Sequence, residues 1–127
     1  MKRYLLTMFL PFLVAGCSSE PTFKSVGVEE FSAIAENENT IVVDVRRADE
    51  WAEGHLEAAQ YNIDALQEDF VSTADATLPK DKTIAIYCRS GRRSKAAATQ
   101  LAEQGFQVVE LDGGIISWQE QGLPVVK

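Results

Sequence analysis

From residue 26 onward, apolar and polar positions follow helical and strand periods in turn. Val28, Phe31 and Ile34 recur at the spacing of one helix face, whereas Ile41 to Val45 is a short β-branched run typical of a buried parallel strand. The expected helices cover 28–34, 48–53, 64–73, 92–104 and 115–121, and the expected strands cover 41–45, 60–63, 83–87 and 107–111. This order predicts an α/β fold with a doubly wound, mainly parallel central sheet flanked by helices.

Two side chains with chemical potential lie where predicted strands end. Asp44 is near the end of the strand at 41–45, and Cys88 directly follows the strand at 83–87. Ligands of doubly wound sheets bind at the carboxyl ends of the strands. We therefore expect the functional site at this edge of the sheet.

The first residues follow a different pattern. Lys2 and Arg3 give a positive start, residues 4–14 are almost entirely apolar, and small residues precede Cys17. This is the order of a signal peptide. The apolar run is shorter than the about 20 residues that a helix needs to span a bilayer.

The segment Val14-Ala15-Gly16-Cys17 resembles a bacterial lipobox. The resemblance implies removal of residues 1–16, acylation of Cys17, a polar tether over 17–25 and a folded domain over 26–127. The protein would be lipid-anchored in the bacterial cell envelope on the extracytoplasmic side, which is the periplasm in a Gram-negative cell. The alternative is an ordinary secretory signal cleaved near Ala15, which leaves Cys17 as a free thiol in a soluble periplasmic protein.

Composition and charge narrow the choice of function. The chain has 127 residues, 46% of them hydrophobic and 24% charged, which predicts one soluble globular domain. Its net charge of -7 gives no basic face for nucleic acid, so this partner is disfavoured. The two cysteines, Cys17 and Cys88, do not form a C-x-x-C pair, which argues against a zinc ribbon or a thioredoxin-like redox pair.

The strand-to-helix segment Cys88-Arg89-Ser90-Gly91-Arg92-Arg93-Ser94 is the strongest chemical signal in the chain. Backbone amides in such a loop, together with the start of the following helix, can hold an anion. The cations gathered here and at Lys95 favour a thiolate at Cys88 and attract a small dianion such as thiosulfate. The pattern predicts a reactive cysteine in an anion cradle.

This loop resembles the active-site loop of rhodanese sulfurtransferases, with their C-x-x-G-x-x-S pattern. Asp44-Val45-Arg46, followed by Trp51-x-x-Gly54-His55-Leu56, is similar to the upstream signature of the family, and Asp112-Gly113-Gly114 with Trp118 is similar to its ending. The resemblance covers about residues 28 to 125. It departs at Glu57-Ala58-Ala59, where the family usually has a glycine-containing turn.

The resemblance implies that Cys88 takes a sulfane sulfur from a donor and passes it, as a persulfide, to a thiophilic acceptor such as cyanide or a thiol. The substrate-binding residues would be those that follow it in the loop, namely Arg89, Ser90, Gly91, Arg92, Arg93 and Ser94. Loop amides would hold the persulfide, and Arg89 and Arg92 would bind the anionic donor. No metal or organic cofactor is indicated.

Three further residues are expected to support the loop. Asp44 and Arg46 could organise the active-site loop or form a structural ion pair. His55 is the single histidine of the chain, and without a cluster of other ligands a packing role is favoured over metal binding.

Two other function classes remain open. A cysteine-dependent phosphatase or arsenate reductase uses a similar cradle, but the C-x5-R signature would need arginine where Ser94 stands. The domain could also be a non-catalytic sulfur carrier or binding module for a membrane partner. The exposed reactive thiol that the cationic loop predicts at Cys88 favours chemistry over binding alone.

Overall fold

The computed structural model describes residues 22–127, so Cys17 and the expected leader lie outside the described part. Five strands form one sheet in the order β2-β6-β5-β3-β4, and every neighbouring pair is parallel. The strands are β2 (Lys24–Val26), β3 (Thr40–Asp44), β4 (Ala59–Asn62), β5 (Thr83–Tyr87) and β6 (Gln107–Leu111). The helices are α1 (Val28–Ala35), α2 (Ala48–Glu53), α3 (Phe70–Thr77), α4 (Arg92–Glu103) and α5 (Gly114–Glu120). The predicted fold class is confirmed.

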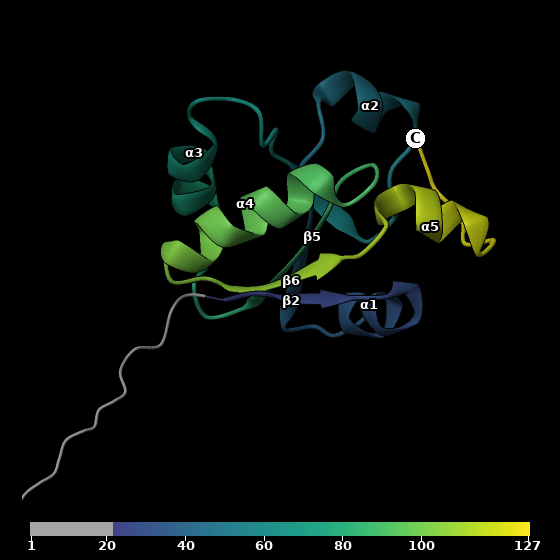
Figure 1. Ribbon diagram of the computed structural model, residues 1–127, viewed down its shortest axis with the longest axis horizontal. Coiled ribbons are helices and arrows are strands. Elements are labelled where there is room, and N and C mark those ends of the chain that lie inside the picture. The colour runs from purple at the N-terminus through teal and green to yellow at the C-terminus, as the bar shows by residue number, and fades with distance from the viewer. Residues whose placement is uncertain (1–21) are drawn as a thin grey trace, which may run out of the picture.

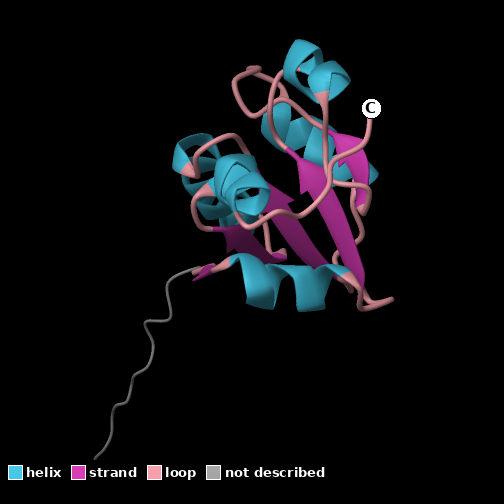
Figure 2. Ribbon diagram, turned by 90° about the vertical axis from the view of Figure 1, so that its right-hand side faces the viewer, coloured by secondary structure: helices cyan, strands magenta, loops and turns pink. Residues whose placement is uncertain are grey.

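Helices cover both faces of the sheet, with α3 and α4 on one side and α1 on the other (Figures 1 and 2). Along β5, Ile84 and Ile86 pack with α3 and α4, whereas Ala85 and Tyr87 pack with α1 and α5. Successive side chains of a strand point to opposite faces, so a strand covered on both sides must be apolar throughout. Cys88 continues this alternation and belongs to the core layer of α3 and α4.

The register of the central strands brings their carboxyl ends to one level. Asp44 pairs with Tyr87, and Ile86 pairs with Glu110. Cys88 therefore leaves the sheet between the ends of β3 and β6. This alignment sets the position of the candidate site.

One predicted helix is wrong in position. The sequence pattern predicts a helix over 64–73, but α3 covers Phe70–Thr77. The Asp64 carboxylate accepts a hydrogen bond from the Leu66 amide at 2.9 Å, which makes a local turn in place of a first helical turn. The helix ends at Leu78, whose backbone is extended because it precedes Pro79.

The sequence pattern does not predict the short edge strand β2. The expected tether over 17–25 therefore extends too far into the domain. Lys24 and Val26 pair with Val109 and Leu111 of β6, so residues 24 and 25 belong to the domain. Only Val26 of the three strand residues is buried, so the segment carries no hydrophobic period that could reveal it. Backbone pairing with β6 makes it a strand.

Within residues 22–127, no helix is both long and apolar enough to cross a bilayer.

Candidate active site

Cys88 lies at the centre of a backbone cradle. Its side chain is buried, and the amides of Gly91 and Ser94 donate hydrogen bonds to Sγ over 3.1 and 3.3 Å. Both amides belong to the beginning of α4, where the helix dipole favours negative charge. The cradle suits a thiolate or another sulfur anion.

Helix α5 fixes the other side of the loop. The amides of Ile115 and Ile116 donate to the carbonyl oxygens of Cys88 and Arg89 over 2.9 and 3.1 Å. These two hydrogen bonds hold the first residues of the loop against α5. Gly114, at φ +62°, allows this approach, because a Cβ there would lie 2.6 Å from the Cys88 carbonyl oxygen and closer still to that of Arg89.

Ser94 connects the sulfur to an acidic side chain that the sequence reasoning missed. Its Oγ lies 3.5 Å from Cys88 Sγ and donates to Glu110 Oε2 over 2.6 Å. Glu110 is fully buried and also accepts hydrogen bonds from Ser25 and Lys95. A charged residue inside the apolar run 108–111 was the available signal, but the role of Glu110 depends on strand register.

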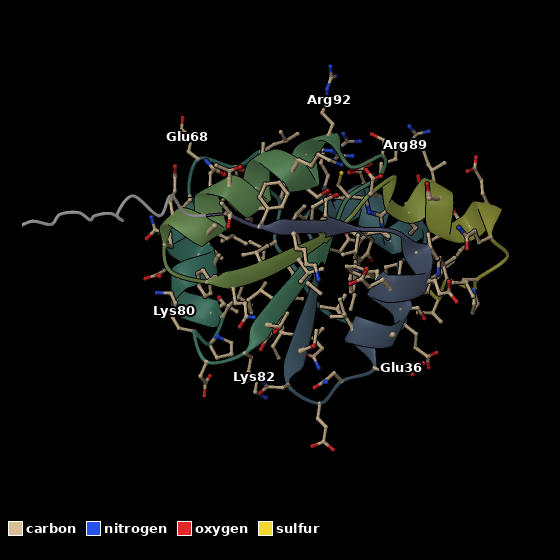
Figure 3. The ribbon with its side chains drawn as sticks, turned by 60° about the horizontal axis from the view of Figure 1, so that its bottom comes forward. Glu36, Glu68, Lys80, Lys82, Arg89 and Arg92 are labelled. Carbon is tan, nitrogen blue, oxygen red and sulfur yellow. The ribbon has the colours of Figure 1, made fainter. Side chains whose placement is uncertain are left out.

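The arginines of the loop have different surroundings. Arg89 and Arg92 are exposed and point away from the fold into solvent (Figure 3). Arg93 is held by Glu50 of α2 through two hydrogen bonds of 2.7 and 3.0 Å. The structure thus leaves two guanidinium groups at the rim and commits the third to a contact between helices. Ser90 is exposed between them.

A polar cleft of about 230 Å³ opens beside the loop. Its lining includes Arg89 and Ile116 together with Arg46, Glu50 and Gly54. A second cleft, with Thr40, Thr83 and Gln107 in its wall, lies at the opposite end of the strands. We take the cleft beside Arg89 as the approach to the site, because it adjoins the cysteine loop.

Asp44 and Arg46 form a buried ion pair behind the loop. The closest contact joins Arg46 Nη2 to Asp44 Oδ2 at 2.7 Å, and the same nitrogen donates to the Gly54 carbonyl oxygen over 2.6 Å. Burial alone would lower the pKa of Arg46, but the hydrogen bond and charge of Asp44 raise it overall. The pair ties the end of β3 to the end of α2.

His55 and Tyr87 make contacts within the same frame. The His55 ring stacks on Trp51 at 3.5 Å, and its backbone forms an antiparallel bridge with Val126. Tyr87 Oη accepts a hydrogen bond from the Leu56 amide over 3.1 Å, and burial strongly raises its pKa. These contacts hold the segment after α2 and the C-terminal residues against the core.

Comparisons with known proteins identify the family. The rhodanese-like domain matches residues 27–121. A sulfurtransferase of Allochromatium vinosum is 40% identical over 96 residues, which cover 73% of this chain and 84% of that protein. Thiosulfate sulfurtransferase GlpE of Pseudomonas fluorescens is 35% identical over 98 residues, covering 76% and 85% of the two chains. The chain belongs to the rhodanese-like family.

Other matches include a solved structure of the same fold and a longer relative that is named for a different activity. A rhodanese-related protein of Thermoplasma volcanium superimposes with a TM-score of 0.67 at 31% identity, covering 82% of this chain and 98% of that chain. A tRNA uridine(34) hydroxylase of Sodalis glossinidius is 32% identical over 128 residues, but the match covers 36% of that longer protein. The relatives that match over most of their length support a rhodanese-family sulfurtransferase.

Gly114→Ala should disrupt the loop. Its Cβ would meet the carbonyl oxygens of Cys88 and Arg89, so we expect an additional loss of about 1–3 kcal/mol over the cost of the left-handed backbone. Chemical unfolding would measure this loss, and the rate of Cys88 alkylation should change with it. Gly105→Ala is the matched control, because Gly105 has φ +95° but open space around it. Equal losses in the two variants would contradict the close contact.

Glu50→Gln should make stability less sensitive to acid. Arg93 lowers the pKa of Glu50 from 4.5 to about 2, so the ion pair stabilises the fold above about pH 4.5 and is lost as the pH falls through 2. We expect the variant to lose on the order of 1–3 kcal/mol at pH 7 and little near pH 2. Urea unfolding at several pH values would measure it.

Glu53→Gln is the control for that series, since Glu53 lies on the same helix and makes no ion pair within residues 22–127. A pH-independent effect of Glu50→Gln would show that the lost stability does not come from the charge.

Proposed function

We propose that this protein transfers a sulfane sulfur from a small anionic donor such as thiosulfate to a thiophilic acceptor, through a persulfide on Cys88. The observation that carries the proposal is the convergence of two backbone amides on Cys88 Sγ at the start of α4. Membership of the rhodanese-like family supports it.

The first half of the reaction loads the cysteine. The Cys88 thiolate attacks the outer sulfur of thiosulfate, a new S–S bond forms, and the original S–S bond breaks with its electron pair leaving on sulfite. The amides of Gly91 and Ser94 hold the negative charge near Sγ. Arg89 and Arg92, exposed at the rim, raise the local concentration of the dianion.

The second half returns the enzyme to its starting state. The acceptor, cyanide or a thiolate, attacks the outer sulfur of the persulfide. The bond between the two sulfurs breaks, and its electron pair returns to Cys88. The product is thiocyanate or a new persulfide. This double displacement needs no metal or redox cofactor.

The name of one relative supports thiosulfate as donor, because the thiosulfate sulfurtransferase of Pseudomonas fluorescens matches over most of its length. A phosphatase is less well supported. Ser94, not arginine, is the sixth residue after Cys88, and its hydroxyl faces Glu110, which would repel a phosphate group. A non-catalytic carrier would load the same persulfide without turning over.

Thiosulfate should add a single sulfur to the protein at Cys88. Intact-protein mass spectrometry should show a gain of about 32 Da, the mass of one sulfur, which cyanide removes as thiocyanate appears. Cys88→Ser should show neither. No adduct on a folded, reduced protein would contradict thiosulfate as donor. An adduct without multiple turnovers would favour the carrier.

We further propose that Cys17 is acylated and anchors the domain outside the cytoplasmic membrane. Cys17 lies outside the described residues, so the proposal rests on the lipobox pattern. The described domain begins at Thr22, a short distance along the chain from Cys17, which is compatible with an anchor close to the fold.

Cells that express the full chain and are fed a labelled fatty acid should incorporate the label into the protein and retain it in the membrane fraction. Cys17→Ser should abolish both, while Cys88→Ser should leave both intact. An unlabelled, soluble protein that lacks the first residues of the chain would point to ordinary secretory cleavage.

A further inference from the structure

Glu110 is a fully buried acidic side chain that the sulfur-transfer steps above do not use. Its carboxylate accepts hydrogen bonds from Ser25 Oγ, from Ser94 Oγ over 2.6 Å and from Lys95 Nζ over 3.2 Å. An ammonium group can only donate, so these are the contacts of a carboxylate acceptor. Burying a carboxylate is costly even when it is paired, and its position beside the cysteine loop suggests a role there.

The connection to the sulfur runs through Ser94. A serine hydroxyl carries one proton. Ser94 Oγ directs it to Glu110 Oε2 at 2.6 Å, and the other acceptor in reach, the Gly91 carbonyl oxygen, lies farther away at 3.2 Å. Ser94 Oγ therefore faces Cys88 Sγ, 3.5 Å away, with its lone pairs. It can accept a hydrogen bond from the thiol but does not donate one to the sulfur anion.

We propose that Glu110 is a positioning residue that holds the Ser94 proton away from Cys88 and thereby keeps the sulfur anion strongly nucleophilic. The hydrogen bonds to the anion then come from the amides of Gly91 and Ser94. The negative charge of Glu110 acts in the same direction, because a like charge nearby disfavours the thiolate. A more basic thiolate is the better nucleophile, so less anion is present but each anion reacts faster.

Other charges lie around the loop, but Glu110 is the one placed to orient the Ser94 hydroxyl. Lys95 is shared between Glu110 and the exposed carboxylate of Asp112, at 3.2 and 2.8 Å. The remaining charged groups around the loop are Arg89 and Arg92 at the surface, Arg93 and Asp64, and Asp44 paired with Arg46. The hydrogen bond to Glu50 raises the pKa of Arg93, and the nearby Cys88 and Asp64 raise it further. Among them, the carboxylate of Glu110 is the one that contacts Ser94.

The test is the pH dependence of Cys88 alkylation by iodoacetamide in a full-length Cys17→Ser background, where Cys88 is the remaining cysteine. Glu110→Gln removes the charge and lets the Ser94 hydroxyl turn to the sulfur. We expect the pH midpoint of alkylation to fall by roughly one unit. The rate at the high-pH plateau should fall about threefold, because nucleophilicity declines with basicity.

Asp112→Asn is the matched control. It removes the same charge from the same lysine but does not touch Ser94, so its midpoint and plateau should equal those of the parent. If Glu110 had only a structural role, Glu110→Gln would lower the stability measured by thermal unfolding but would not move the pH midpoint of alkylation.

The inference rests on the proposed function in taking Cys88 as the reactive sulfur, and the experiment separates the two. A folded Glu110→Gln protein with the parent's midpoint and plateau would overturn the inference alone, as would an equal shift in Asp112→Asn. A folded parent in which Cys88 does not react would overturn both.

If Glu110→Gln does not fold, the pH midpoint of alkylation in Ser94→Ala tests the inference instead. Loss of a hydroxyl that donates only to Glu110 should not raise the midpoint. A raised midpoint would show that the hydroxyl stabilises the anion and would overturn the inference.

Discussion

Two backbone amides directed at one sulfur atom are the interaction on which the rest of the site depends. The amides of Gly91 and Ser94 reach Cys88 Sγ because the chain reverses between β5 and α4. Backbone donors do not titrate and need no rotamer, so their position is set by the fold alone. Other parts of the fold must therefore hold this short loop in place.

Three parts of the chain distant in sequence provide that restraint. Helix α5 binds the carbonyl oxygens of Cys88 and Arg89, α2 holds Arg93 through Glu50, and β6 holds Ser94 through Glu110. The buried pair of Asp44 and Arg46 joins the end of β3 to the carbonyl of Gly54. Buried ion pairs are poor sources of net stability, and their value here is the geometry they impose on the loop edge.

The same arrangement relates the reactivity of the sulfur anion to how strongly the site stabilises that anion. A cradle that stabilises the sulfur anion too strongly would make it a weaker nucleophile, because basicity and nucleophilicity of thiolates rise together. The amides and the start of α4 favour the anion, while the carboxylate of Glu110 opposes it. In sulfur transfer the cysteine must both accept a sulfur and release it. A balance between stabilisation of the anion by the amides and its destabilisation by Glu110 suits this task better than maximal stabilisation.

The sequence by itself determined the fold class and the strands at 83–87 and 107–111, and it made Cys88 the candidate centre of chemistry, because hydrophobic periods and loop motifs are local signals. Tertiary structure decided what local patterns do not contain. The strand β2 exists by pairing with β6, and α3 begins at Phe70 because Asp64 makes a turn. The placement of α2 decides that Arg93 contacts Glu50. The register of β6 decides that Glu110 lies against Ser94. Contacts between residues far apart in the chain arise only when the sheet assembles, which is why they could not be read from the sequence.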